Sequence, residues 1–161
     1  MTYYSNGPIR FATVSMVTAS LGANDPEVGT VVEVGDEKYI FCYNTGSSTV
    51  GVGCGAVVSG VTGYSVTVSS VTHADVPVGV CKHVAIPTGS YGWLLQRGFS
   101  TYQAGSAVAI GAGLTLGADG LWQAQLVTTA YSQVVLPTVY GKAMTSAVSS
   151  ASGSDAYFRI A

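Results

Sequence analysis

Two histidines, an aspartate and a cysteine lie within eleven residues and form the most chemistry-like cluster of the sequence. In HADVPVGVCKH, His73 and Asp75 are two residues apart, and so are Cys81 and His83. Residues two apart share one face of a strand, so a hairpin could bring all four side chains to one metal ion. The spacing matches no zinc signature, however, and Asp75 precedes a Val-Pro turn. The pattern therefore favours a turn-capping aspartate and two hydrogen-bonded histidines over a metal hydrolase.

Other motifs that could support catalysis are incomplete. The segment GVGCGAVVSG lacks the GxGxxG spacing and a following helix, so we interpret it as a tightly packed strand rather than a phosphate loop. No GxSxG motif is present for a serine hydrolase. Glu33, Asp36 and Glu37 lie at an expected hairpin tip, where acids are usually solvated, and no acids flank an aromatic groove as in glycosidases. We therefore expect no enzymatic activity, no cofactor and no metal.

Composition indicates a β-rich domain that buries part of its surface against other chains. Of the 161 residues, 48% are hydrophobic and only 9% are charged, against about 25% charged in typical proteins. Val, Ser, Thr and Gly, which favour strands and turns, dominate. A monomer needs charges to stay soluble, so their scarcity favours a chain that assembles with other chains. A secreted domain made soluble by hydroxyl groups is the alternative.

Charge and cysteine content indicate which partners and which cellular compartment are expected. The net charge is −2, and the basic residues are scattered along the chain, so no nucleic-acid partner is expected. The three cysteines are an odd number set in apolar runs, which predicts free, buried thiols in a protein made in a reducing cytoplasm. We expect no signal peptide, and no run approaches 18 apolar residues, so no membrane association is expected.

The chain divides into an arm and a body. Residues 1–26 contain Asn-Gly-Pro and Asn-Asp-Pro breakers and predict an extended N-terminal arm. The arm carries Tyr3, Tyr4, Arg10 and Phe11, aromatic and basic side chains that we expect to dock on a neighbour or on the body. Residues 27–161 form the β-rich body. Its strands recur about every ten residues between Gly, Asn, Asp or Ser turns, as in an antiparallel β-sandwich or barrel of jelly-roll-like type.

The sequence predicts the secondary structure of three segments of the body. VVEV and YIFCYN form a hairpin, with Tyr39, Phe41 and Tyr43 on one face of the second strand. A further strand is expected from Gly79 to Ile86. Residues 142–151 have apolar spacing that suits a helix, but their Ser and Thr content fits a strand and loop at least as well.

The stretch YGWLLQRG has the composition of a contact strand. As a strand, it places Tyr91, Trp93, Leu95 and Arg97 on one face. This row is either a core strand whose arginine reaches solvent at a barrel rim, or an interface row, since Trp, Tyr and Arg are enriched at contact hot spots. The interface residues that we predict are Tyr3, Tyr4, Arg10, Phe11, Tyr91, Trp93 and Arg97.

Several of these segments together resemble the head decoration, or cement, proteins of tailed bacteriophages. They are EVGTVVEVGDEKYIFCYN, PVGVCKHVAIPTGSYGWLLQRG, AVAIGAGLTLGADGLWQ and YGKAMTSAVSSASGSDAYFRIA, within residues 28–161. The resemblance lies in glycines and aromatic residues. It implies a non-enzymatic virion protein, usually a homotrimer, seated on the capsid exterior and bound to the major capsid protein. Synthesis in the host cytoplasm is implied as well.

A second hypothesis is a carbohydrate- or receptor-binding β-domain of a virion appendage. Such a domain needs a groove of exposed aromatic side chains. The candidates in this sequence are Trp93, Tyr102 and Trp122. Exposure of these three side chains would distinguish this hypothesis from the first.

Overall fold

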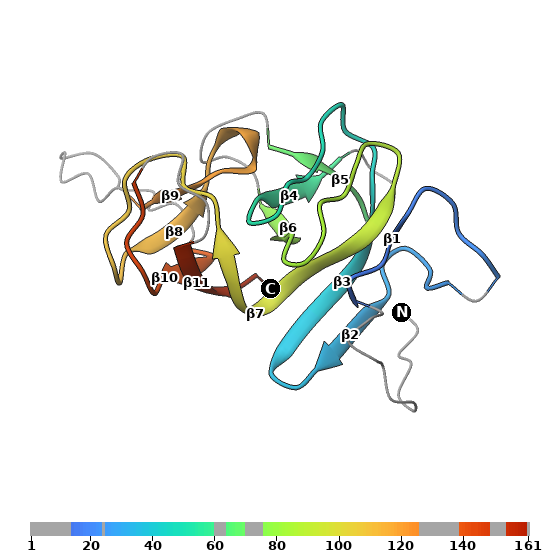
Figure 1. Cartoon of the computed structure of the whole chain (residues 1–161), viewed down its shortest axis with the longest axis horizontal. Helices are drawn as coiled ribbons and strands as arrows, with labels where there is room; N and C mark the ends of the chain where they lie inside the picture. Colours follow the sequence, from blue (N-terminus) through green and yellow to red (C-terminus); the bar gives the residue numbers. More distant parts are fainter. Residues whose placement is uncertain are drawn as a thin grey trace.

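The computed structural model describes residues 14–23, 25–59, 64–69, 76–125, 139–148 and 154–160, and its elements are almost all strands (Figure 1). The all-β barrel expectation is confirmed. The elements are β1 (Val17–Thr18), β2 (Val31–Val34), β3 (Glu37–Asn44), β4 (Gly55–Val58), β5 (Ser65–Val68), β6 (Pro77–Val80), β7 (Tyr91–Tyr102), β8 (Gly113–Leu116), the 3₁₀ turn η1 (Ala118–Gly120), β9 (Trp122–Ala124), β10 (Gly141–Ala143) and β11 (Ser154–Arg159).

Five strands close into a barrel. The order β3-β5-β4-β6-β7 is completed by the pairing of β7 with β3, so the ring has no free edge. Four of these five pairings are antiparallel, whereas β3 and β5 run parallel. That parallel pair departs from a purely antiparallel jelly roll. β2 extends the sheet beyond β3 as the expected hairpin, whose turn places Gly35 at φ 62°, a conformation that glycine adopts without strain.

Alternating side chains of β3 and β7 fill the inside of the barrel. Ile40, Cys42 and Leu94 point inward with Val66 and Ile86, and all five are buried. The residue of β6 at its close approach to β7 is Gly79, which has no side chain. A Cβ atom on Gly79 would lie 2.7 Å from the Leu94 Cβ atom and 2.8 Å from the Leu95 carbonyl oxygen. Glycine at this position therefore allows the two strands to meet.

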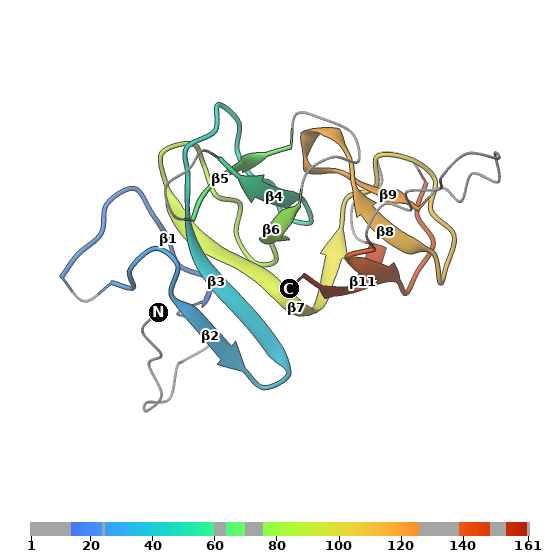
Figure 2. The same cartoon turned by 180° about the vertical axis from the view of Figure 1, so that it is seen from behind.

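A second lobe is built on the other half of β7 (Figures 1 and 2). There the sheet continues in the order β7-β11-β10-β8-β9, and a bridge between Ala104 and Trp122 brings the segment after β7 back to β9. The core of this lobe includes Tyr102, Leu114, Trp122 and Phe158, and it continues to Val57 and Val80 of the barrel strands β4 and β6. The single 12-residue strand β7 thus belongs to both lobes.

The outer face of β3 and β7 is aromatic and covered by the chain itself. Tyr39, Phe41 and Tyr43 share this face, as predicted, because Phe41 pairs with Trp93 and Tyr43 with Tyr91 across the strands. The buried residues of this cluster are Val14, Val32, Tyr39, Phe41, Trp93 and Leu95. Val14 and β1 belong to the range that the sequence assigns to the arm, and β1 pairs with β7. This part of the arm lies on the body.

Two expectations at element level are resolved. The strand expected from Gly79 to Ile86 is wrong in extent: β6 ends at Val80, the chain is irregular afterwards, and Ile86 forms an isolated bridge with Val50. Pro77 and Gly79 already set the contacts of β6 with the neighbouring strands β4 and β7. The residues from Cys81 to Ile86 are not needed for those contacts, and they cross the end of the barrel. In the described part of 142–151, β10 is followed by a bridge at Ala147, so the strand-and-loop alternative is correct.

Candidate interaction surface

Tyr91, Trp93 and Leu95 share one face of β7, as predicted, and this face is mostly covered within the chain. Arg97 does not belong to it, because the register shifts between Lys38 and Tyr39 and places Arg97 opposite Lys38, on the other side of the sheet. Trp93 is 4% exposed and its ring centroid lies 4.9 Å from that of Phe41. Its indole nitrogen has no hydrogen-bond partner among the described residues. Tyr91 is half-buried, and its ring lies 4.4 Å from that of Tyr43. Of the four residues predicted to share a face, Arg97 alone reaches the rim. Tyr3, Tyr4, Arg10 and Phe11 lie outside the described residues.

The candidate metal cluster is divided by the structure. His73 and Asp75 lie outside the described residues. Cys81 is inside the barrel, where its thiol donates a hydrogen bond to the Val84 carbonyl oxygen at 3.1 Å. His83 is on the outside, with its ring 5.7 Å from that of Tyr39. Cys81 and His83 therefore do not face one site, and the described residues contain no group of three or more His, Cys, Asp or Glu placed to hold a metal ion.

The three cysteines are free and buried, as expected. Burial raises the pKa of the Cys42 thiol above its usual range, and it raises the pKa of Cys81 to about 12. The thiolate is the reactive form of cysteine. These side chains therefore act as small apolar core residues rather than as nucleophiles.

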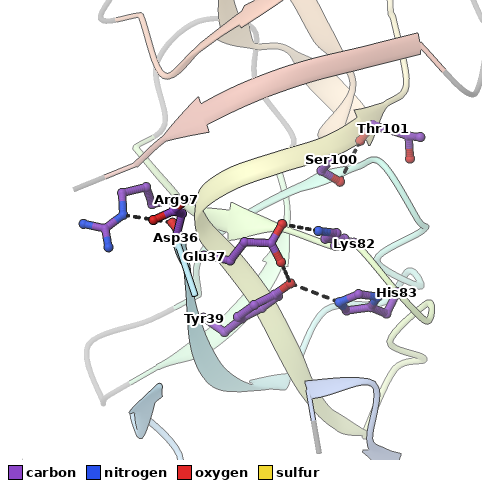
Figure 3. A network of polar contacts seen from close by, with 8 residues as sticks. All are labelled: Asp36, Glu37, Tyr39, Lys82, His83, Arg97, Ser100 and Thr101. Atoms are coloured by element: carbon purple, nitrogen blue, oxygen red, sulfur yellow. Dashed lines mark hydrogen bonds and ion pairs between the residues drawn. The ribbon is translucent and has the colours of Figure 1, made fainter. Parts of the chain in front are cut away.

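A polar network joins the start of β3 to the segment after β6 (Figure 3). Glu37 forms an ion pair with Lys82 and accepts a hydrogen bond from the Tyr39 hydroxyl at 2.5 Å. The Tyr39 oxygen lies 3.0 Å from His83 Nε2. Because the tyrosine proton is directed at Glu37, His83 must donate from Nε2. Glu37 was expected to be a solvated turn residue, but it is the centre of this network. The sequence did not indicate this, because Lys82 is 45 residues away.

The network and its burial shift the pKa values of Glu37, His83 and Tyr39. Burial alone would raise the pKa of Glu37, but the hydrogen bonds from Lys82 and Tyr39 outweigh it and lower that pKa below 4.5. Burial, together with the Lys82 charge, lowers the pKa of His83 below 6.5. Burial and the bond to Glu37 raise the pKa of Tyr39. The network therefore keeps Glu37 charged and His83 neutral at neutral pH.

We expect folding stability to fall in two steps on acidification. Both pKa values are lower in the folded than in the unfolded state, so each contribution is complete above the unfolded pKa and is lost as pH falls through the folded one. The first step begins near pH 6.5 for His83, and the second begins near pH 4.5 for Glu37. Urea midpoints measured from pH 8 to pH 3 would show this. His83→Gln should reduce the first step and Glu37→Gln the second, whereas Asp36→Asn, at an exposed position, should change neither. An unchanged profile in both network variants would contradict the assignment.

Four basic residues gather on one side of neighbouring strands, although they are far apart in sequence. Lys38 of β3 lies opposite Arg97 of β7, and Arg97 lies opposite Arg159 of β11. Lys142 of β10 follows beside Tyr157. Directly opposed residues point to the same side of a sheet, so these four form one group. Along the chain these residues are scattered, and only strand register brings them together.

Exposed aromatic rings lie among these cations. Phe99 is 56% exposed and packs edge-on against Tyr157, with ring centroids 5.0 Å apart. Arg97 is partly compensated by Glu33 at 3.4 Å and by the Asp36 carbonyl oxygen at 3.3 Å. Within the described part of the chain, the Arg159 side chain has neither an ion pair nor a hydrogen bond. We call this surface the cationic face: Lys38, Arg97, Phe99, Lys142, Tyr157 and Arg159.

The end of the second lobe exposes apolar side chains. Ile110 and Val148 are each 71% exposed, and Met144 is 45% exposed. Their segments are neighbours, because Val108 and Ala147 form a bridge. Gathered exposed apolar residues of this kind mark interaction sites on soluble proteins. We call Ile110, Met144 and Val148 the distal patch.

The aromatic groove required by the carbohydrate-binding hypothesis is not formed by its candidates. Tyr102 and Trp122 are 0% exposed and Trp93 is 4% exposed. The Tyr102 hydroxyl donates to the Thr145 carbonyl oxygen, and the Trp122 indole donates to the Gly53 carbonyl oxygen. The polar ends of Tyr102 and Trp122 are therefore satisfied within the fold, and all three rings are core residues. The exposed groove that this hypothesis requires is not formed by them.

Comparison with known proteins shows a fold likeness among solved structures. No family model matches the chain, and no curated protein does. Among solved structures, the chain is similar to the N base of head fiber gp8.5 of bacteriophage phi29, with a TM-score of 0.52 and 17% identity. The match covers 76% of this chain and 96% of that one. The described residues contain no helix long and apolar enough to span a membrane. The likeness shows that the two chains share a fold.

Proposed function

We propose that this chain is a structural protein of a bacteriophage head. The observation that carries the proposal is the fold likeness to the N base of a phage head fiber, which extends over almost all of that chain. The low content of charged residues and the exposed distal patch support the proposal, because both are typical of a protein that functions while bound to other proteins. The decoration-protein resemblance of residues 28–161 points to the same class.

The specific role that we propose is that of a decoration protein. In this role the chain forms a homo-oligomer, expected to be a trimer, which binds the major capsid protein on the outside of the head and performs no catalysis. It would stabilise the shell by adding apolar contact and hydrogen bonds across the joints between capsid subunits. Each contact can be modest, because many copies act on one shell.

Binding to heads tests this function directly. The purified chain is mixed with empty heads of its phage and sedimented, and the heads are then heated with and without it. We expect the chain to sediment with the heads and to raise their disruption temperature. The chain should also be found in purified virions by mass spectrometry. Absence from virions together with a failure to bind heads would overturn the proposal.

The distal patch is the surface that we expect to seat on the shell. Changing Ile110→Asp and Val148→Asp together should weaken head binding about tenfold or more, since a charge buried at an apolar contact costs at least ~1.4 kcal/mol. Val58→Asp is the matched control, because Val58 is 51% exposed and lies on the barrel. Titrating each variant against a fixed amount of heads gives the affinities. Equal affinities for all three proteins would place the seat elsewhere.

A further inference from the structure

We propose that copies of this chain join head to tail, with the acidic loop of one copy on the cationic face of the next. The acidic loop is the segment between β1 and β2 that carries Leu21, Asp25 and Glu27. The inference concerns contact between copies and does not depend on binding to a phage head.

The cationic face carries more cations than carboxylates: Lys38, Arg97, Lys142 and Arg159 stand against Glu33 and Asp155 on the same side of the sheet. Arg97 and Arg159 are directly opposed across two strands, and like charges in that position destabilise a sheet. Glu33 contacts Arg97, but Arg159 and Lys142 have no ion-pair partner among the described residues. A partner that supplies carboxylates would relieve the repulsion. It would also cover Phe99, whose ring is 56% exposed between the cations.

The acidic loop has the complementary composition. Glu27 is exposed, and Leu21 is 39% exposed. Asp25 shapes the loop, because its carboxylate accepts the Gly22 amide hydrogen bond at 2.7 Å. The loop therefore presents one free carboxylate, one partly engaged carboxylate and one apolar side chain on a turned segment. An acid with an apolar neighbour is the arrangement that fits cations around an exposed aromatic ring.

The loop of a copy is placed away from the face of the same copy. It leaves the body at Thr18, which pairs with Tyr91 at the start of β7, and it returns at Gly29, which donates to the Phe41 carbonyl oxygen. The cationic face lies on the far half of β7, from Arg97 onward. Six residues of strand separate Tyr91 from Arg97, which is roughly 20 Å. Figures 1 and 2 show the described part of the loop extending beyond the barrel beside β1. The partner is therefore another copy.

The pairing of two different surfaces has a consequence for assembly. Such a contact is heterologous, and it closes into a ring when the rotation between copies permits.

Complementation between two variants tests the proposal on the isolated full-length chain. Glu27→Arg alters the loop, and Arg159→Glu alters the face; both residues are exposed, so both variants should fold, which circular dichroism verifies. The native chain should form a ring by analytical ultracentrifugation up to about 1 mM, and each variant alone should associate at least tenfold more weakly. An equimolar mixture should give a two-chain species, since the intact loop of the face variant binds the intact face of the loop variant.

Each alternative outcome is decisive. A monomeric native chain overturns the proposal, and so do variants that associate like the native chain. Variants that both lose association and show no complementation would indicate a two-fold contact of like surfaces instead. The variant Lys38→Glu should behave as the face variant does. Binding of a fluorescent single-stranded oligonucleotide, abolished by Arg159→Glu, in a chain that does not self-associate would assign the face to nucleic acid.

Discussion

Replacing Trp122 with alanine is expected to lower the free energy of unfolding by about 3–5 kcal/mol. Trp122 is 0% exposed, and its ring lies 4.7 Å from that of Phe158 in the core of the second lobe. It also reaches the barrel: its indole nitrogen donates to the Gly53 carbonyl oxygen at 3.1 Å, and a Cβ atom on Gly55 would lie 2.8 Å from its ring. The substitution therefore opens a cavity at the junction of the two lobes.

Urea denaturation followed by circular dichroism measures this loss. Trp122→Phe is the matched control, because it keeps most of the ring volume and removes the hydrogen bond. The Gly53 carbonyl oxygen still accepts from the Gln103 amide, so we expect the control to lose about 1–2 kcal/mol. If Trp122→Ala lost less than about 3 kcal/mol, the two lobes would be able to close the cavity that the missing ring leaves at their junction.

Replacing Gly79 with alanine is expected to cost about 3 kcal/mol, the upper end of the usual range for overpacking. The added Cβ atom would lie 2.7 Å from the Leu94 Cβ atom and 2.8 Å from the Leu95 carbonyl oxygen. Neither neighbour is the flexible end of a side chain, so β6 must move away from β7. Those strands share one registered pair, Val80 with Leu95. The barrel would therefore open at its weakest pairing.

Gly51→Ala is the control for that substitution. The nearest atom to a Cβ at Gly51 is the Cys54 sulfur at 3.5 Å, an ordinary contact, so its unfolding midpoint should stay close to that of the native chain. Hydrogen exchange provides the second measurement, since the amides of β6 should lose protection in Gly79→Ala before those of β3. Equal midpoints for the two variants would show that β6 shifts without cost.

The sequence predicted local features better than the closure of the sheet. Alternation on β3 correctly placed Tyr39, Phe41 and Tyr43 on one face, because that period is set by the strand itself. The pairing of β3 with both β5 and β7 depends on segments more than 20 residues apart in sequence, and no local pattern specifies it. The extent of β6 was misjudged because apolar residues after Val80 suggested a continuing strand, whereas Cys81 turns into the barrel core.

The candidate site was predicted only in part. Arg97 was identified from its place at the end of an aromatic row, and it does reach the surface. Its neighbours Lys38 and Arg159 were not, because only strand register makes them neighbours. Trp122 was a candidate for an exposed aromatic groove and is a core residue, since residue type alone cannot distinguish a binding platform from a core ring. Glu37 was missed for a similar reason: its partner Lys82, like the His83 that contacts Tyr39, follows a different strand.

The sharing of β7 between the lobes gives the molecule a mechanical property. Two domains joined by a linker move apart when pulled, because the linker carries the load alone. Here a pull between the distal patch and the barrel runs along one continuous strand, which is hydrogen-bonded to β3 over its first half and to β11 over its second. The bonds lie across the strand and are loaded in shear, so several must break together. Separating the two lobes therefore requires breaking strand pairs and not only extending a linker.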